Sequence, residues 1–182
     1  MDLVKGIKER RSIRKFQDKP IPREVIEEIV ETARFAPSWK NTQIVRYLVI
    51  DDKEKIAEIA NSKCTYGFDY NIKTIAAAPA VVILTFVEGK SGFDKDGSFS
   101  TPKDDRWQMF DAGIAAQTFC LAAHEKGLGT VIQGYFDDDE LKKILPIPKG
   151  QQVGAVIPIG YPLDGEVQAP PRKETAELLT FI

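Results

Sequence analysis

Four cations and a serine lie close together near the amino terminus of this 182-residue chain. The segment from Glu9 to Phe16 has the sequence ERRSIRKF, in which Arg10, Ser12 and Arg14 are spaced two apart. Alternate side chains of an extended backbone share one face, so these three would point the same way. Arginine forks and a serine hydroxyl suit a phosphate group or a conjugated carbonyl edge. The spacing therefore indicates a site for a small anion.

A second pair of cations lies near the other end of the chain. Arg172 and Lys173 follow Ala169-Pro-Pro171, a stiff segment that could hold both side chains in place. A phosphate dianion needs clustered positive charge of this kind. The alternative is that both groups are solvated surface cations, and the spacing by itself leaves the two interpretations open.

The overall charge argues against a nucleic-acid partner. The chain has 25 Lys and Arg against 27 Asp and Glu, a formal net charge of −2, whereas nucleic-acid binders usually carry a basic excess over a whole face. The first residues, MDLVK, are too charged for a cleavable leader, and the apolar run near 75–87 is too short to cross a membrane. We therefore expect a cytoplasmic protein with no membrane partner.

The sequence contains few residues that could bind a metal ion or act as a catalytic nucleophile or base. Cys64 and Cys120 are far apart, and His124 is the single histidine, so a zinc site, a disulfide framework or a histidine-based triad is not expected. His124 is interpreted as a polar residue on a helix face. The glycine-rich segments do not match nucleotide-binding motifs. Gly127-Leu-Gly129 lacks the third glycine of the dinucleotide-binding fingerprint, and residues 92–97 have P-loop spacing but are followed by Ser-Phe rather than Lys-Ser/Thr.

The hydrophobic pattern predicts one domain over residues 1–182, of the α/β or α+β class. Apolar periodicity and proline positions predict the following elements. Helices are expected near residues 3–7, from 22 to about 36, and over 52–60, 106–126 and 137–145, and strands over 46–50, 80–87, 130–135 and 153–159.

Three segments of this pattern bear on function. Residues 88–105 form a long polar loop, and such a loop is usually a functional lid or disordered. The helix over 106–126 is apolar on several faces, which predicts burial in the core or against another subunit. Residues 162–182 contain three prolines and a weak helical signal, as in a protruding arm.

Four segments in order resemble the FMN-dependent nitroreductase family: RRSIRKF, APSWKNTQ, GLGTVIQGYF and PPRK. The resemblance covers nearly the whole chain. It implies an α+β fold with a central, mostly antiparallel sheet flanked by helices. It also implies a homodimer that exchanges its C-terminal arms and has two FMN sites at the subunit interface.

The resemblance also implies a role for particular residues. Arg10 and Ser12 would hold the ribityl-phosphate side, Arg14 would lie near flavin N1 and O2, and Asn71 would contact the pyrimidine ring. A loop would reach the partner's flavin, a backbone amide of a later segment would meet N5, and the last two cations would bind the phosphate. The implied cofactor contacts are Arg10, Arg11, Ser12 and Arg14; Pro37, Ser38, Trp39, Asn41 and Gln43; Asn71; Ile132, Gln133 and Gly134; and Arg172 and Lys173.

Several of these residues have a simpler interpretation. Trp39 could be a core aromatic, Asn41 could cap a turn, and Gln133 could be a strand residue whose backbone alone acts. Gly134 suits the close approach of a ring to the backbone. Phe68, Tyr70 and Phe93 could line the substrate side, but aromatic residues more often pack in the core, so they are left out of the predicted site.

The chain departs from the family pattern at three places. Gln43 is followed by Ile-Val rather than Pro-Trp, Thr74 stands near where some relatives have lysine, and Gln133 replaces an acid. FMN binding is still expected, whereas the choice of substrate is left open.

The resemblance implies that FMN carries the chemistry and that no side chain is a catalytic acid, base or nucleophile. NADH or NADPH would give a hydride to the flavin, and a nitroaromatic or quinone acceptor would take it from the same face in a ping-pong sequence. Arg14 would stabilise negative charge at the N1 edge. Three alternatives remain: a specialised relative that reduces enones, dehalogenates or consumes flavin; a non-catalytic flavin carrier; or a protein that binds a phosphorylated partner.

Overall fold

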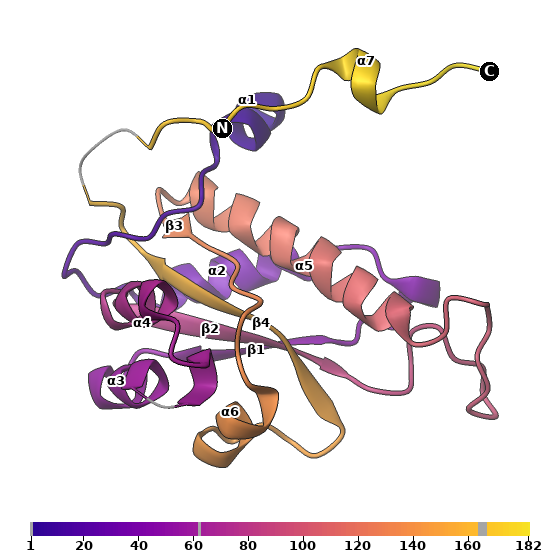
Figure 1. Cartoon of the computed structure of the whole chain (residues 1–182), viewed down its shortest axis with the longest axis horizontal. Helices are drawn as coiled ribbons and strands as arrows, with labels where there is room; N and C mark the ends of the chain where they lie inside the picture. Colours follow the sequence, from indigo (N-terminus) through magenta and orange to yellow (C-terminus); the bar gives the residue numbers. More distant parts are fainter. Residues whose placement is uncertain (1, 62, 164–166) are drawn as a thin grey trace.

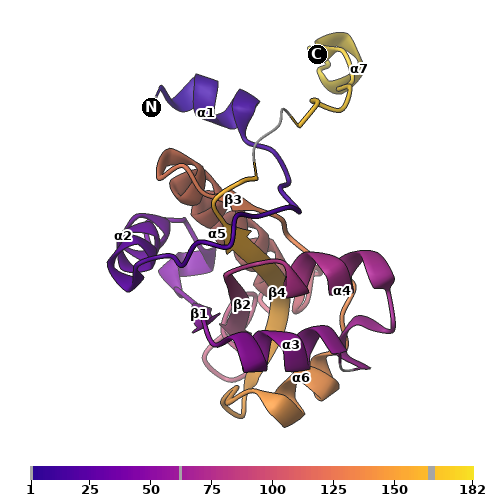
Figure 2. The ribbon, with the colours of Figure 1, turned by 90° about the vertical axis from the view of Figure 1, so that its left-hand side faces the viewer.

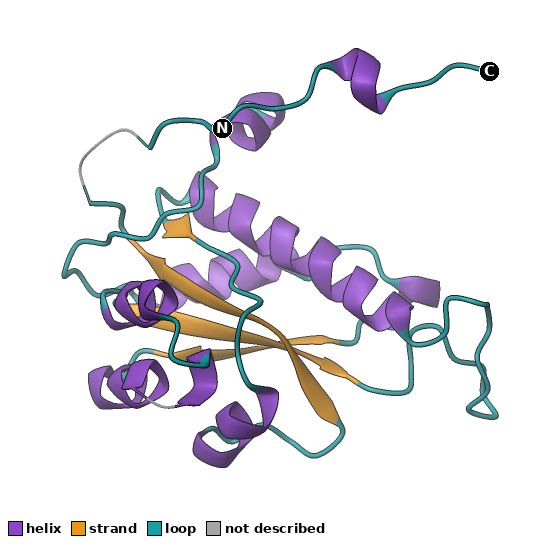
Figure 3. Cartoon of the chain, viewed as in Figure 1, coloured by secondary structure: helices purple, strands orange, loops and turns teal. Residues whose placement is uncertain are grey.

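A four-stranded antiparallel sheet forms the centre of the computed structural model, which describes residues 2–61, 63–163 and 167–182 (Figure 1). Its strand order is β1-β2-β4-β3, where β1 is Val45–Ile50, β2 is Ala80–Val87, β3 is Gly129–Thr130 and β4 is Gln151–Gly160. Helices flank the sheet (Figure 3). The expected α+β class with an antiparallel sheet is therefore confirmed.

Strand β2 is buried on both faces, which explains its unbroken apolar sequence AVVILTFV. Ala80, Val82, Leu84 and Phe86 pack with α2 (Arg23–Ala33) and α5 (Arg106–Glu125). The alternate residues pack on the other face with α3 (Lys53–Asn61), α4 (Asp69–Ala76) and α6 (Asp138–Ile144) (Figure 2). The two-residue period of the strand thus divides the apolar residues between two core layers.

Aspartate side chains define where three of the helices begin. Asp2, Asp52 and Asp137 each accept a hydrogen bond from the backbone amide three residues later, at 2.8–3.0 Å. An acceptor at this position satisfies one of the amides that a helix start leaves unpaired. The caps hold α1 (Leu3–Glu9), α3 and α6 close to their predicted starts.

The secondary structure differs from the predictions in three places. The strand predicted over 130–135 ends at Thr130, since the next residue of the partner strand is Pro158, which has no amide hydrogen to donate. Beyond it the Val131 amide still donates to the Pro158 carbonyl at 3.3 Å, and Gln133 pairs with Val156 as an isolated bridge. Helix α4 was missed, and α2 ends at Ala33 rather than near 36 because its last turn tightens into three-residue turns.

The cationic segment follows α1 as an extended strap, residues 10–16. The Ile13 amide donates to the carbonyl of Thr130 at 2.9 Å, and Ser12 forms a bridge with the same residue. A Cβ on Gly129 would lie 2.5 Å from the Ile13 side chain, and one on Gly160 would lie 2.8 Å from Phe16. Only glycine leaves room for the strap at these two positions.

The carboxyl-terminal arm extends away from the sheet (Figure 1). Residues 167–182 are exposed, and the short helix α7 (Thr175–Leu178) is held by a reciprocal capping box between Glu174 and Glu177. Among the described residues, no helix has both the length and the apolar character needed to cross a membrane.

Candidate functional site

The strap, α4 and the segment after β3 meet beside the end of the sheet. Arg14 of the strap lies over the ring of Tyr70 on α4, with its guanidinium carbon 5.4 Å from the ring centroid. The next residue on α4, Asn71, is buried and donates from Nδ2 to the carbonyl of Tyr135 at 3.3 Å. The structure therefore brings together three of the predicted segments: the strap, Asn71 and residues 132–134.

Gly134 presents open backbone at this place. The amide and carbonyl of Gln133 are both bonded to Val156, at 2.9 and 3.0 Å, whereas a Cβ on Gly134 would meet no atom within 4 Å. Ile132 beside it is 45% exposed, and Gln133 is buried. A flat ring can therefore approach the backbone at Gly134, while Gln133 is committed to the sheet.

Arg10 has a buried donor with no partner. Its Nε is shielded from solvent and makes no hydrogen bond, and the same is true of Nε2 of His124 near the end of α5. Both residues line a cavity of about 650 Å³ between the strap, the end of α5 and the start of the arm. The two residues contribute a guanidinium and an imidazole to the lining of this cavity, and such groups suit a ligand that carries acceptor oxygens. His124, expected as a polar residue on a helix face, is thus also part of the cavity lining.

The other cations of the strap are oriented differently. Arg11 turns back onto α1, where Nη1 donates to the carbonyls of Lys8 and Arg10 at 2.6 and 2.9 Å. Arg14 is exposed and donates to the Ser12 carbonyl at 3.2 Å. Arg11 thus closes the helix end, and Arg14 faces the ring side.

The arm begins at the same cavity. Val167, Gln168 and Ala169 line it, and Arg172 lies three residues further on, within about 10 Å of chain. Arg172 donates to the carbonyls of Pro170 and Pro171, at 3.0 and 3.3 Å, and Lys173 is exposed. Their assignment to a phosphate stays a prediction.

The loop over residues 37–43 is a strained turn. Lys40, Asn41 and Gln43 all have positive φ angles, of 44°, 55° and 50°. Each costs roughly 1–2 kcal/mol for a residue other than glycine. The Ser38 hydroxyl accepts from the Gln43 amide at 2.9 Å and closes the turn, while Pro37 before it is exposed. Such strain is typical of functional loops that the surrounding structure holds in place.

Trp39 is half-buried rather than part of the core. Its ring packs against Trp107 of α5 with centroids 4.5 Å apart, and its backbone amide donates to Asp111. Its Nε1 is shielded and has no partner. The loop is therefore fixed to the amino-terminal part of α5.

The loop and the strap lie at opposite ends of α5 (Figure 1). Trp39 contacts Asp111, whereas Arg10 lines a cavity with His124, thirteen residues further along the helix. At 1.5 Å per residue the two places are about 20 Å apart. One chain therefore does not bring all of the predicted residues around one ligand.

An aromatic cluster borders Arg14 and Gly134. Phe68 lies 6.2 Å from Tyr70 and 5.7 Å from Tyr135 between centroids, and Tyr66 lies 5.1 Å from Tyr135. All four rings are exposed. Desolvation and the nearby carboxylate of Asp137 raise the pKa of Tyr66. Phe68 and Tyr70 had been left aside as packing residues, but solvent exposure shows that they form a surface beside the site.

Comparison with known proteins identifies the family of this chain. The sequence model described as the nitroreductase family matches residues 7–65 and 68–161. The chain belongs to the nitroreductase family. It is 29% identical over 181 residues to a Bacillus subtilis protein named FMN reductase [NAD(P)H], covering 93% of this chain and 69% of that one. It is 28% identical to an iodotyrosine deiodinase of Haliscomenobacter hydrossis, covering 86% and 77%.

A solved nitroreductase family structure from Clostridium novyi NT has the same fold. It superimposes with a TM-score of 0.76 at 27% identity, covering 90% of this chain and 87% of that one. Within the described ranges of this nitroreductase family member, no group of three or more His, Cys, Asp or Glu is placed to hold a metal ion.

Proposed function

We propose that this nitroreductase family member is an enzyme that binds FMN and transfers a hydride from NADH or NADPH to a nitroaromatic or quinone acceptor by a ping-pong mechanism. The observation that carries the proposal is the cavity that adjoins the strap and is lined by Arg10 and His124. FMN combines a phosphate and a flat ring, and the two ends of the strap offer a fit to each. When bound, FMN supplies a centre that can accept and return a hydride.

The protein residues divide between the two ends of the cofactor. Arg10 would meet phosphate oxygens, and Arg172 and Lys173 would join it when the arm folds back. Arg14 would hold positive charge at the pyrimidine edge, where fixed cations in a dry site stabilise developing negative charge by several kcal/mol. The open backbone at Gly134 would let the ring lie against the protein.

A homodimer would supply the missing part of the site. Helix α5 presents an exposed face formed by Met109, Phe110, Gly113 and Gln117, which recur at helical spacing. A twofold axis near the middle of this face would place two copies of α5 antiparallel. The 37–43 loop of one subunit would then lie beside the strap of its partner, and both sites would be complete.

Exchange of the arms is part of the proposal. Leu178, Leu179, Phe181 and Ile182 are exposed at the end of the arm. Strand β1 pairs only with β2, so its outer edge is unpaired within the described chain, and an apolar cavity of about 520 Å³ lies beside it. The arm of a partner could cover this edge, which would otherwise be open to non-specific pairing.

The acceptor is proposed to be a flat, electron-poor molecule. The exposed rings of Phe68, Tyr70 and Tyr135 lie beside the open backbone at Gly134 and would stack on such a molecule. The same surface would suit a halogenated phenol, and one relative is named for iodotyrosine deiodination. Reductive dehalogenation is therefore the second candidate activity.

The test is a visible spectrum of the purified protein reconstituted with FMN, followed by anaerobic addition of NADH or NADPH. We expect bound flavin to bleach with a donor and to recover with a nitroaromatic or quinone. Bleaching followed by recovery only with iodotyrosine would favour dehalogenation. Flavin that binds but cannot be reduced would indicate a non-catalytic carrier, and a protein that takes up no flavin would contradict the proposal.

A further inference from the structure

Asp111 is a buried carboxylate that none of the proposed contacts uses. It lies on the sheet-facing side of α5 with 2% of its surface exposed. Both of its oxygens lie 3.1 Å from the amide nitrogen of Trp39, which donates to them, and Oδ2 also accepts from the hydroxyl of Ser91. The Trp39 amide is the first of a helical turn whose preceding residue gives no side-chain cap, so Asp111 satisfies it from another element.

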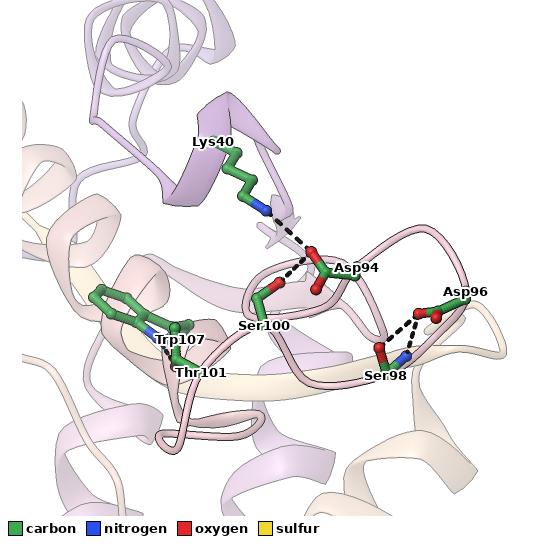
Figure 4. A network of polar contacts seen from close by, with 7 residues as sticks. All are labelled: Lys40, Asp94, Asp96, Ser98, Ser100, Thr101 and Trp107. Atoms are coloured by element: carbon green, nitrogen blue, oxygen red, sulfur yellow. Dashed lines mark hydrogen bonds and ion pairs between the residues drawn. The ribbon is translucent and has the colours of Figure 1, made fainter.

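Hydrogen bonds continue from Asp111 into the loop and into the 88–105 segment. Ser91, which donates to Asp111, is 2.6 Å from the Thr42 hydroxyl, so one carboxylate contacts the start of the turn directly and its end through a serine. Lys40 at the tip of the turn donates to Asp94 at 3.2 Å (Figure 4). The strained turn is thus held at its beginning, tip and end.

The 88–105 segment is itself fastened to α5. Ser100 donates to Asp94 at 2.6 Å, and the indole of Trp107 donates to Thr101 at 3.0 Å (Figure 4). A Cβ on Gly92 would lie 2.5 Å from the Asp104 carbonyl, so the segment folds tightly against itself. These contacts form a brace between α5 and the 37–43 loop. The expectation that residues 88–105 act as a lid stays a prediction.

A carboxylate at this buried position is energetically unfavourable unless other groups compensate it. Burying a charge costs free energy unless several hydrogen bonds compensate it, and among the described residues Asp111 forms no ion pair. Its bonded partners are an amide and a hydroxyl. The carboxylate accepts from the Trp39 amide and from the Ser91 hydroxyl at once, and these hydrogen bonds compensate its burial.

We propose that Asp111 is a positioning residue that presets the 37–43 loop for the flavin of the partner subunit. The inference rests on the proposed function, because it takes FMN as the ligand and a homodimer as the assembly. Asp111 acts through Trp39 and Ser91 and touches no reacting atom. Its loss therefore lowers the affinity for flavin at the partner's site, and the subunit's own phosphate grip is unaffected.

The first experiment compares Asp111→Ala and Asp111→Asn with the wild-type protein. Asp105→Asn is the matched control, since Asp105 is an exposed carboxylate at the start of the same helix that makes no capping bond. Hydrogen exchange of the 37–43 amides needs no cofactor, and we expect it to quicken at least tenfold in the alanine variant. The dissociation constant for FMN should rise about fivefold in the asparagine variant and more in the alanine variant, since neutral hydrogen bonds are weaker than charged ones.

A mixed dimer separates positioning from general destabilisation. Chains with Asp111→Ala are paired with chains that carry Arg172→Ala and Lys173→Ala. If Asp111 acts on the partner's flavin, one site receives both defects and the other receives none, so half of the sites bind FMN with wild-type affinity. If Asp111 only supports its own subunit, no site has wild-type affinity, and the proposal is overturned.

Two further outcomes are decisive. Wild-type exchange rates in the loop, or wild-type FMN affinity in both Asp111 variants, would overturn the inference. If the alanine variant shows no cooperative melting, the asparagine variant carries the same comparisons. A wild-type protein that binds no FMN would instead refute the proposed function, whatever the loop does.

Discussion

Arg10 and Arg14 belong to one extended strap but meet different surroundings. Arg10 lines the cavity together with His124, while Arg14 is exposed over the ring of Tyr70. The guanidinium of Arg10 is therefore the group of the strap that is placed to meet a phosphate in this cavity, and Arg14 is placed to meet a ring. The alternation of side chains along an extended chain predicted that Arg10 and Arg14 point to the same side. Their different surroundings suit them to different parts of a ligand.

A double substitution at the arm tests the phosphate assignment. Arg172→Ala with Lys173→Ala should weaken FMN binding at least tenfold, because charged hydrogen bonds contribute about 1.5–3 kcal/mol each, and should leave riboflavin binding nearly unchanged. Fluorescence titration with both ligands measures this, with Lys149→Ala, an exposed lysine far along the chain, as the control. Equal losses for FMN and riboflavin would remove the arm from the phosphate site.

At the scale of elements, glycine positions decide what may approach the sheet end. Ile13 of the strap occupies the space where a Gly129 side chain would lie, whereas the corresponding space at Gly134 is open. The two glycines therefore make room for different partners. One lets the protein pack on itself, and the other leaves room for a ligand.

Alanine substitutions distinguish the two purposes. Gly129→Ala should destabilise the protein by about 1–3 kcal/mol, since the new methyl overlaps Ile13. Gly134→Ala should leave the melting temperature of the cofactor-free protein nearly unchanged and weaken flavin binding. Thermal melting and FMN titration of both variants check this. Unchanged FMN affinity in Gly134→Ala would mean that the ring does not lie against this backbone.

The brace formed by residues 88–105 should persist across the physiological pH range. Hydrogen bonds from Ser100 and then Lys40 lower the pKa of Asp94 below its ordinary value of 3.8. A lowered pKa stabilises the folded state above the ordinary value, and this contribution is lost as the pH falls through the lowered pKa. Hydrogen exchange in 88–105 should therefore be constant between about pH 5 and 8, after correction for intrinsic rates, and should rise only below about pH 4. Asp94→Asn should reduce that rise and leave the part that comes from Asp96, whose pKa is also lowered, by hydrogen bonds from Ser98. A rise near neutral pH would contradict this assignment.

At the scale of the whole molecule, the site is divided between the two ends of α5. The loop is held near Asp111 and the strap near His124. On the outer face of α5, Met109 and Phe110 are exposed near the loop, and Gly113 and Gln117 continue this face toward the strap. A dimer that buries this face joins the loop of one chain to the strap of another. Flavin binding and dimerisation should therefore be coupled.

Phe110→Asp tests the coupling. Phe110 is 59% exposed, and a twofold interface would bury it twice. Placing two carboxylates there should weaken the dimer on the order of a thousandfold, from the lost burial of two aromatic side chains. Analytical ultracentrifugation and FMN titration are the measurements, and Asn61→Asp, an exposed change at the end of α3, is the control. A monomer that still binds FMN with wild-type affinity would rule out a shared site.

The features that were predictable from the sequence are those that depend on neighbouring residues. Strand β2 occupies its predicted residues. The spacing of Arg10, Ser12 and Arg14 predicted an extended backbone, and the strap has one. These features depend on neighbouring residues, because side-chain alternation, capping and apolar periodicity act over a few positions. The resemblance to the family likewise depended on short segments in a fixed order.

Contacts between segments that are distant in the sequence became known only from the folded structure. The bond from the Trp39 amide to Asp111 joins residues 72 apart, and no local pattern marks either of them as a partner of the other. Pro158 shortened the strand at Thr130, 28 residues earlier in the sequence, by lacking a donor. The separation of the loop from the strap also follows from where each packs along α5. Such contacts depend on how distant elements meet, and composition and periodicity do not specify that meeting.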